Sequence, residues 1–253
     1  MSQHHAIPET SLLLSRRKAL GLLGAFGAAG LAGCAAGEGG DVVQAATGTT
    51  SNGTTTTCIL TPALTEGPYF VDEKLNRSDI TDGQSGVPLT LNMNVYNANN
   101  ASCAVLPNVQ IDIWHCNAQG LYSDINVQGN AGQSGLKYLR GYQVSDASGN
   151  LTFKTIYPGW YSGRTVHIHL KARIFDAANN VTKEFNTQIF FDDSLSDSVF
   201  TQTPYNSRGT RNTRNSNDGI YNSTGSNSSA VLIALSGSNS SGYSGSFGVG
   251  LSL

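Results

Sequence analysis

Short segments in which apolar and polar residues alternate recur along the chain, and they limit its possible folds more than any other feature. In residues 165–174 and 243–251, for example, apolar side chains occupy every second position. Residues two apart point to the same face of a β-strand, so each segment has one apolar face. No stretch keeps a 3.6-residue apolar period over three turns, which argues against long helices. The alternation therefore predicts an all-β fold.

Turn-forming residues separate the expected strands at short intervals. Residues 146–150, Asp-Ala-Ser-Gly-Asn, are typical of a hairpin connection. Residues 192–228 are polar and turn-rich, and we expect them to form a long surface excursion. This organisation predicts a β-sandwich of mostly antiparallel strands with long loops. The expected strands are residues 88–96, 109–114, 138–145, 151–156, 165–174, 187–191, 230–235 and 243–251.

The N-terminal residues resemble a bacterial export signal. Residues 15–18, Ser-Arg-Arg-Lys, precede an apolar run at 19–32 that is too short to span a membrane comfortably. The twin arginine indicates the route that exports folded, cofactor-loaded proteins. Residues 31–34, Leu-Ala-Gly-Cys, resemble a lipoprotein box, so we expect residues 1–33 to be removed and Cys34 to be lipidated. The alternative is a plain signal peptide with an incidental cysteine. The protein is thus expected in the cell envelope or secreted.

The segment after Cys34 has little to bury. Residues 34–57 are rich in Gly, Thr and Ser and are predicted to form a flexible linker, which leaves 58–253 as the folded domain. That domain holds three cysteines, and an odd number predicts one disulfide and one free thiol in an exported protein. The sequence leaves the pairing among Cys58, Cys103 and Cys116 open.

The charge of the chain limits its partners. Fifteen Lys and Arg residues stand against 17 Asp and Glu, so the formal net charge is −2. Nucleic-acid-binding proteins need a basic surface, so no nucleic-acid partner is expected. The expected lipid anchor would be the only attachment to a membrane. The oligomeric state is left open.

Two histidines stand out within the expected strand at 165–174. His167 and His169 are two residues apart, so both imidazoles project from one face and could bind a single metal ion. Two of the five histidines lie in the segment expected to be removed, which leaves this pair and His115. A pair of structural histidines in the core is the simpler interpretation of this motif taken alone.

Several segments in a fixed order give this histidine pair a chemical meaning. Together they resemble the intradiol ring-cleavage dioxygenases, and in particular the secreted, single-domain branch of that family. The resemblance covers most of residues 58–191. The segments that carry it are Leu60-Thr61-Pro62, Thr65-Glu66-Gly67-Pro68-Tyr69, Ile113-Trp114-His115-Cys116-Asn117-Ala118-Gln119-Gly120-Leu121-Tyr122-Ser123, Leu139-Arg140-Gly141-Tyr142-Gln143, Phe153-Lys154-Thr155-Ile156-Tyr157-Pro158-Gly159-Trp160-Tyr161 and Arg164-Thr165-Val166-His167-Ile168-His169.

The resemblance implies a non-haem iron(III) enzyme whose metal ligands are Tyr122, Tyr161, His167 and His169. The donor types are consistent with that metal. Phenolate oxygens are hard, charged donors that suit Fe(III), whereas a ferrous oxygenase typically uses two histidines and a carboxylate. Two phenolates and a hydroxide would also neutralise a trivalent cation.

The same resemblance assigns roles to residues around the metal. Arg164 would stabilise the electron-rich substrate ring, and Gln188 would lie in the active site. Tyr161 would act in catalysis as well as in metal binding. The residues expected to form the wall of the substrate pocket are Thr65, Gly67, Tyr69 and Trp160, although Trp160 could instead belong to the core.

The implied reaction inserts both atoms of O2 into a small aromatic diol and opens the ring between the two hydroxyls, giving a muconate-type diacid. Catechol or hydroxyquinol is expected in preference to a carboxylated ring, because the motif region supplies only Arg164 as a cation and that residue is assigned to the reacting ring. A second cation could come from Arg140 or from the 200–221 segment if either folds over the pocket.

Two other classes of protein are compatible with parts of the sequence. An exported copper- or zinc-binding β-sandwich could use His167 and His169, but it would need a third histidine or a carboxylate nearby. A carbohydrate-binding β-sandwich could use Trp160 and Tyr161 as stacking platforms. Colour separates them, because tyrosinate bound to iron(III) makes a protein red-brown.

Overall fold

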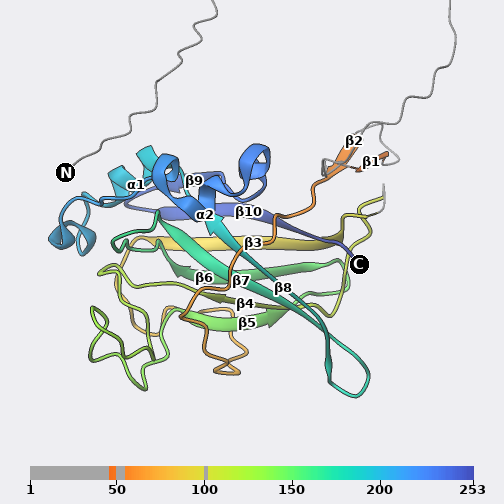
Figure 1. Cartoon of the computed structure of the whole chain (residues 1–253), viewed down its shortest axis with the longest axis horizontal. Coiled ribbons are helices and arrows are strands. Elements are labelled where there is room, and N and C mark those ends of the chain that lie inside the picture. The colour runs from red at the N-terminus through yellow and green to blue at the C-terminus, as the bar shows by residue number, and fades with distance from the viewer. Residues whose placement is uncertain (1–45, 50–54, 100–101) are drawn as a thin grey trace, which may run out of the picture. The chain divides into compact units, whose positions relative to one another are not determined.

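The chain folds into two β-sheets that pack face to face, as the computed structural model shows for residues 46–49, 55–99 and 102–253 (Figure 1). One sheet has the strand order β6-β3-β10-β9 and the other β5-β4-β7-β8. The predicted all-β sandwich is therefore confirmed. The strands are β3 (Pro88–Asn97), β4 (Gln110–Trp114), β5 (Arg140–Val144), β6 (Asn150–Ile156), β7 (His167–Phe175), β8 (Val181–Phe190), β9 (Leu235–Ser238) and β10 (Gly242–Leu251).

The C-terminal strand lies inside the first sheet and not at its edge. β10 runs parallel to β3 on one side and antiparallel to β9 on the other. Its alternating residues Phe247, Val249 and Leu251 are buried in the core. The strand predicted at 243–251 is thus present, and it is parallel to β3 although every other pairing in the two sheets is antiparallel.

The prediction of a strand at residues 230–235 is wrong. Residues Gly225–Ala230 form a 3-10 helix (η3), and β9 begins only at Leu235. Val231 and Ile233 are buried, which explains the apolar pattern in the sequence. Their backbones hydrogen bond with Phe190 at the end of β8, with N–O distances of 2.8 and 2.9 Å. The segment therefore connects to the second sheet through an isolated bridge and does not extend the first sheet.

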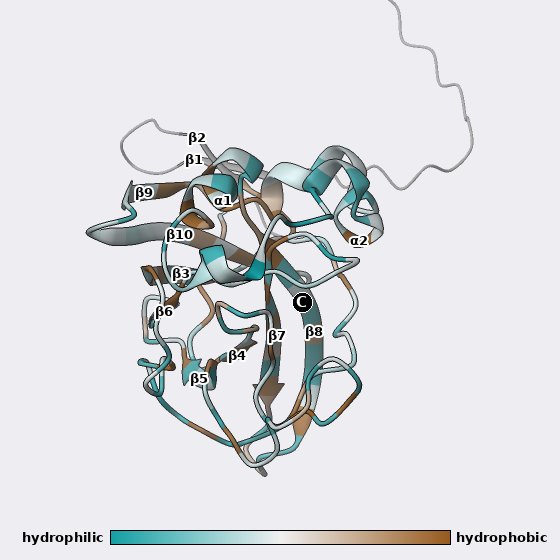
Figure 2. Ribbon diagram, turned by 90° about the vertical axis from the view of Figure 1, so that its left-hand side faces the viewer, coloured by the Kyte–Doolittle hydropathy of each residue, from teal (hydrophilic) through white to brown (hydrophobic). Residues whose placement is uncertain are grey.

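β7 divides its side chains between the core and the opposite face of its sheet. Ile168, Leu170 and Ala172 pack in the main hydrophobic cluster, whereas the odd-numbered residues from His167 to Arg173 point away from it. In Figure 2, β7 is largely apolar along its length and the neighbouring β8 is largely hydrophilic. The alternation in the sequence therefore places both histidines on the outer face of the sandwich.

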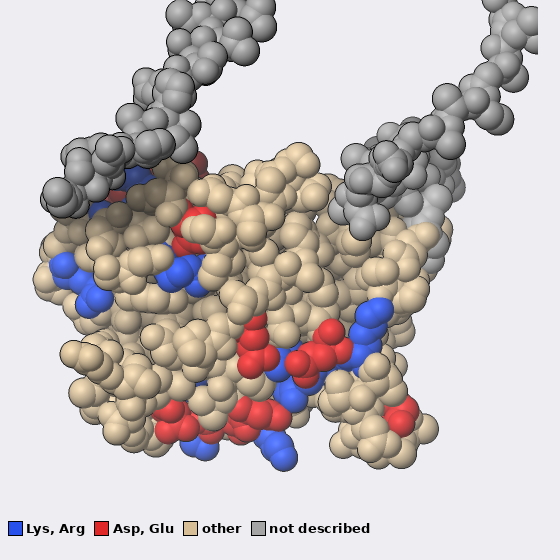
Figure 3. Space-filling view, in the orientation of Figure 1, with Lys and Arg blue, Asp and Glu red and all other residues tan. Residues whose placement is uncertain are grey.

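The irregular segment that precedes β3 covers this outer face. Lys171 forms ion pairs with Glu66 (2.5 Å) and Glu184 (3.0 Å), and its ammonium lies 4.0 Å from the centre of the Phe70 ring. Figure 3 shows acidic and basic side chains lying next to one another over β7 and β8. Paired charges on β7 thus attach the covering segment beside the two histidines.

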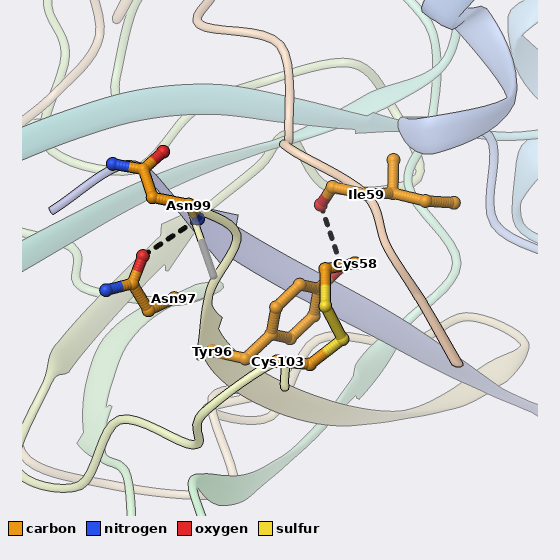
Figure 4. Close-up of a disulfide and its surroundings, with 6 residues drawn as sticks. All are labelled: Cys58, Ile59, Tyr96, Asn97, Asn99 and Cys103. Carbon is orange, nitrogen blue, oxygen red and sulfur yellow. Dashed lines mark hydrogen bonds between the residues drawn. A yellow bond between two sulfur atoms is a disulfide. The ribbon is translucent and has the colours of Figure 1, made fainter. Parts of the chain in front are cut away.

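A disulfide joins Cys58 to Cys103 near the start of the folded domain (Figure 4). Beside it, the Tyr96 hydroxyl donates to the backbone oxygen of Ile59 at 2.8 Å. Cys116 is buried and is the free cysteine of the described residues. The pairing that the sequence left open is therefore Cys58 with Cys103.

The segment predicted as a surface excursion contributes buried residues as well as exposed turns. Val199 and Tyr205 belong to the main core, and the Tyr205 hydroxyl donates to the backbone oxygen of Tyr157 at 2.7 Å. Asp218 has no exposed surface. The elements of this segment are α1 (Asp193–Val199), η1 (Tyr205–Arg208), η2 (Asn215–Asn217), α2 (Gly219–Asn222) and η3.

Part of the predicted linker is described by the structure. β1 (Ala46–Thr49) and β2 (Thr55–Cys58) pair antiparallel. The other residues of the linker and the predicted signal, with Cys34, lie outside the described residues. Over the described ranges, no helix is long and apolar enough to cross a membrane.

Candidate functional site

The loop after β4 fixes the position of Tyr122. The side-chain oxygen of Asn117 accepts hydrogen bonds from the backbone of Gln119 and Leu121, both at 3.0 Å, which closes a tight turn. The Asn130 amide then holds the Tyr122 backbone on both sides, accepting from its N–H at 2.7 Å and donating to its oxygen at 2.8 Å. Tyr122 is thereby held with its side chain buried.

A glycine brings the second tyrosine close to this loop. A Cβ at Gly159 would lie 2.3 Å from the backbone oxygen of Asn117, so only a residue without a side chain allows the approach. Tyr161 follows two residues later. The Tyr122 and Tyr161 rings meet edge to face, with ring centroids 5.7 Å apart.

Four side chains converge at one point on the outer face of β7. The hydroxyl oxygens of Tyr161 and Tyr122 lie 3.1 and 3.4 Å from Nε2 of His167. Nε2 of His169 lies 3.1 Å from the same atom. The other ring nitrogen of His167 lies 2.6 Å from the Thr165 backbone oxygen, which fixes its proton on Nδ1 and leaves Nε2 as a free lone pair. The structure thus brings together all four residues that the sequence proposed as metal ligands.

Burial sets the protonation of these groups. It lowers the pKa of His167 to about 3, with a further contribution from the Arg164 charge, and it also lowers the pKa of His169. Burial raises the pKa of Tyr122 and Tyr161, and the neighbouring Tyr161 phenol raises the pKa of Tyr122 further. At neutral pH the protein alone therefore holds two neutral imidazoles and two neutral phenols, and only a strong cation would ionise the phenols.

His169 is confined from three sides. The Trp114 ring stacks on it with a centroid distance of 4.9 Å and an interplanar angle of 4°. A Cβ at Gly67 would lie 2.9 Å from its Cε1, and Gly67 has a φ of +76°. Gln188 is its partner in the β7–β8 ladder. Gly67 therefore packs directly against His169, whereas the sequence predicted it in the wall of the substrate pocket.

Arg164 is oriented by two buried partners. Its Nε donates to Asp218 at 2.8 Å, and one terminal nitrogen donates to Gln188 at 2.5 Å. The other terminal nitrogen lies 3.5 Å from Nε2 of His167. The Gln188 amide in turn donates to the Thr65 backbone oxygen at 2.9 Å. The guanidinium is thus directed at the point where the four side chains meet.

Asp218 was missed by the sequence analysis. Its carboxylate accepts hydrogen bonds from the backbone N–H groups of Thr165, Ile220 and Tyr221 and from the Arg164 side chain. It therefore caps the start of α2 and joins it to the residues that lead into β7. Burial acts to raise the pKa of this carboxyl, but these donors and the arginine charge outweigh it and lower the pKa below 3.8. An Asp directly before a short apolar segment is a helix-start signal, which could have identified it.

A cavity of about 270 Å³ opens beside the two tyrosines. Of the predicted pocket residues, Tyr69 lines it and packs against Tyr122, with the rings tilted by 38° and a centroid distance of 4.7 Å. Thr65 and Gly67 are not among its lining residues, and neither is Trp160, which packs against the core. Arg208, which the sequence did not single out, does line the cavity.

The four converging side chains fit a single metal ion. Ligand atoms at about 2.0–2.2 Å from a common ion lie roughly 3 Å apart, which is the spacing observed here. The donor set is two imidazoles and two phenols, which suits a hard trivalent cation. In the described part of the chain, no group of three or more His, Cys, Asp and Glu side chains could hold a metal. The third histidine or carboxylate that a copper or zinc site would need is therefore not found there.

Comparisons with known proteins agree with this geometry. A family model described as Dioxygenase matches residues 61–224. A solved intradiol ring-cleavage dioxygenase from Tetranychus urticae is 31% identical, with a TM-score of 0.66 over 77% of this chain and 95% of that chain. The dioxygenase domain of a carbohydrate-binding fusion protein from Streptomyces sp. SirexAA-E is 27% identical, with a TM-score of 0.54 over 77% of this chain and 99% of that one.

A curated relative matches over a shorter region. Catechol 1,2-dioxygenase from Acinetobacter baylyi is 30% identical over 106 residues, which is 40% of this chain. The match spans about a third of that relative's length, at 32%.

Proposed function

Because the chain belongs to the intradiol ring-cleavage dioxygenase family, we propose that it opens the ring of a small catechol-type diol between the two hydroxyls. The carbon–carbon bond between the hydroxyl-bearing carbons breaks, and both atoms of O2 enter the two new carboxyl groups of a muconate-type product. O2 is the oxidant, so no other redox partner is needed. The observation that carries the proposal is the convergence of two phenols and two imidazoles beside a cavity.

The metal would be iron(III), held by Tyr122, Tyr161, His167 and His169. Both imidazoles are kept neutral by burial, so their Nε2 lone pairs are available to a cation. A bound ferric ion would supply the charge that ionises the two phenols and activates the diol toward O2. Hard phenolate donors favour the ferric over the ferrous state.

The protein's own residues then handle protons and charge. Tyr161 is the less buried of the two phenols, so its oxygen is the one placed to accept a proton from an incoming diol. Arg164 directs a fixed positive charge at the same point and would stabilise the negative charge that develops on the ring. Asp218 and Gln188 hold that guanidinium still, so it needs no rearrangement during the reaction.

The two alternative classes receive less support. The converging set includes two tyrosines, which a copper or zinc sandwich does not require. Trp160 is half-buried against the core and Tyr161 is directed at His167, so they do not form an exposed stacking platform for a sugar.

The direct test of the reaction is product identification. Purified protein is incubated with a panel of diols (catechol, hydroxyquinol and 3,4-dihydroxybenzoate) in air, and the products are identified by absorbance and mass. We expect muconate-type diacids that contain both atoms of labelled O2. A semialdehyde from cleavage beside the hydroxyls, or no oxygen-dependent product from any diol, would overturn the proposal.

A further inference from the structure

The cavity beside the two tyrosines contains a cation whose charge has no acidic partner. Arg208 lines this cavity, and Nε donates to the Trp160 backbone oxygen at 2.6 Å. Its guanidinium carbon lies 5.0 Å from the centre of the Trp160 ring. Within the described part of the chain, no Asp or Glu pairs with it, and its two terminal nitrogens have no hydrogen-bond partner. A guanidinium has five N–H donors, so four of them remain available.

The other arginines near the site are already engaged. Arg164 is bound to Asp218 and Gln188. The buried Arg140 donates to the backbone of Ser123 and Tyr69 through all three of its nitrogens. These partners fix both side chains: Arg164 is directed at the metal-binding point, and neither arginine lines the cavity. Arg208 does line it, and it comes from the 200–221 segment, from which the sequence suggested a second cation could come.

The position of Arg208 is imposed by close packing. A Cβ at Gly120 would lie 2.9 Å from its guanidinium carbon and 2.2 Å from the Trp160 backbone oxygen, so a glycine is needed for this approach. Gly120 lies two residues before Tyr122, and Trp160 is next to Tyr161. The arginine is therefore anchored to both tyrosine segments, at the wall of the cavity that they share.

We infer that Arg208 is a specificity-determining residue that binds an anionic substituent, such as a carboxylate, on the ring of the diol substrate. This inference rests on the proposed function. A guanidinium binds a carboxylate with two parallel hydrogen bonds, and none of the residues that line the cavity is acidic. The cavity is smaller than the 300–1,000 Å³ typical of drug-sized ligands, which suits a single substituted ring.

This inference reverses the preference expected from the sequence. Catechol or hydroxyquinol was favoured there because a carboxylated ring would need a second cation. Arg208 supplies that cation from a position more than 80 residues beyond Tyr122 in the chain. We therefore expect an acidic catechol to bind more tightly than a neutral one of the same size.

The test compares two ligands that differ in charge. Binding of 3,4-dihydroxybenzoate and of its methyl ester to the iron-containing protein is measured by calorimetry without oxygen, so that no turnover occurs. We expect the acid to bind at least about tenfold more tightly. A hydrogen bond to a charged group contributes more free energy than a tenfold difference in affinity requires. In Arg208→Gln that ratio falls to about one, and in Arg208→Lys part of it is retained because the charge remains.

A matched control removes a positive charge elsewhere. Lys154 is exposed on β6, in the other sheet, and Lys154→Gln should keep the wild-type ratio. A wild-type ratio near one, or the same ratio in wild type and Arg208→Gln, would overturn the inference. Ring cleavage is assayed separately in air. A protein that prefers the acid but forms no diacid would refute the proposed function alone, and one that cleaves diols without this preference would refute the inference alone.

Discussion

Arg164 and Asp218 form the pair on which the charge of the site depends. The carboxylate is fully buried, whereas the arginine side chain is 16% exposed and reaches toward the metal-binding point. Three backbone N–H groups also donate to Asp218, so one side chain both begins α2 and orients the arginine. A charged helix cap is thereby used as a positioning group for the reaction.

Replacing Asp218 by Asn separates these two tasks. Asn caps helices about as well as Asp, so α2 should remain, but Arg164 loses its counter-charge. We expect Asp218→Asn to lower the free energy of unfolding by roughly 1–3 kcal/mol and to reduce turnover more than substrate affinity. Denaturant unfolding and steady-state kinetics measure the two effects.

The pH dependence of this effect has a defined sign. The pKa of Asp218 is lower in the folded protein than its ordinary value of 3.8. Its contribution to stability is therefore fully present above about pH 4 and is lost as the pH falls through the folded pKa. The control is Asp192→Asn, which removes a charge from the cap of α1 at an exposed position. Equal losses of turnover in the two variants would contradict the role given to Asp218.

Short motifs made part of the site predictable at this scale. His167 and His169 lie on one strand, and each tyrosine lies in a contiguous, recognisable segment, so the convergence of the four could be expected from the sequence. Arg208 could not be identified in this way, and Asp218 is indicated by its sequence only as a helix start. Both lie in a polar, turn-rich stretch, and their roles come from contacts with residues about 50 positions away in the chain.

At the scale of elements, the segment that precedes β3 is as important as β7. Glu66 pairs with Lys171, and Asp72 pairs with Arg173, so charges along β7 hold the segment against the outer face. Gly67 is thereby held in close contact with His169. The covering segment therefore closes the metal-binding point from one side.

Two glycines of this region allow a matched comparison. Gly67 and Gly83 both have positive φ, at +76° and +78°, so Ala at either position carries a similar backbone strain of about 1–2 kcal/mol. A Cβ at Gly83 meets nothing within 4 Å, whereas at Gly67 it meets His169 at 2.9 Å. We expect both variants to lose stability in thermal unfolding, Gly67→Ala by more because of the added contact with His169, and only Gly67→Ala to lose iron. Full iron occupancy in Gly67→Ala would show that the contact does not constrain the histidine.

The strands were predictable where one face is apolar and the other polar. β3 and β7 satisfy that condition, and their bounds match the expectation closely. β8 was recognised only at its end, because the residues that begin it are exposed and lack an alternating pattern. The prediction for residues 230–235 failed for a different reason, since the apolar residues there are buried in a segment that pairs with Phe190 only through an isolated bridge.

At the scale of the whole molecule, we propose that the enzyme works outside the cytoplasm. The twin arginine and the Leu-Ala-Gly-Cys motif at 31–34 support this proposal. The Cys58–Cys103 disulfide is consistent with it, because disulfides persist in oxidising compartments. Mass spectrometry of the protein purified from its native membranes should find residues 1–33 absent and Cys34 carrying lipid. An unmodified Cys34, or cleavage at another residue, would remove the predicted anchor.

The central claim is that two tyrosines and two histidines hold one ferric ion, and the visible absorption spectrum of the iron-containing protein tests it most directly. We predict a red-brown protein with about one iron per chain, because tyrosinate transfers charge to iron(III). His167→Ala should lose both the iron and the colour. His115→Gln should keep them, since His115 binds Thr155 and the Cys116 backbone oxygen and does not point into the site. A colourless protein with iron bound, or one that binds zinc or copper in place of iron, would contradict the account.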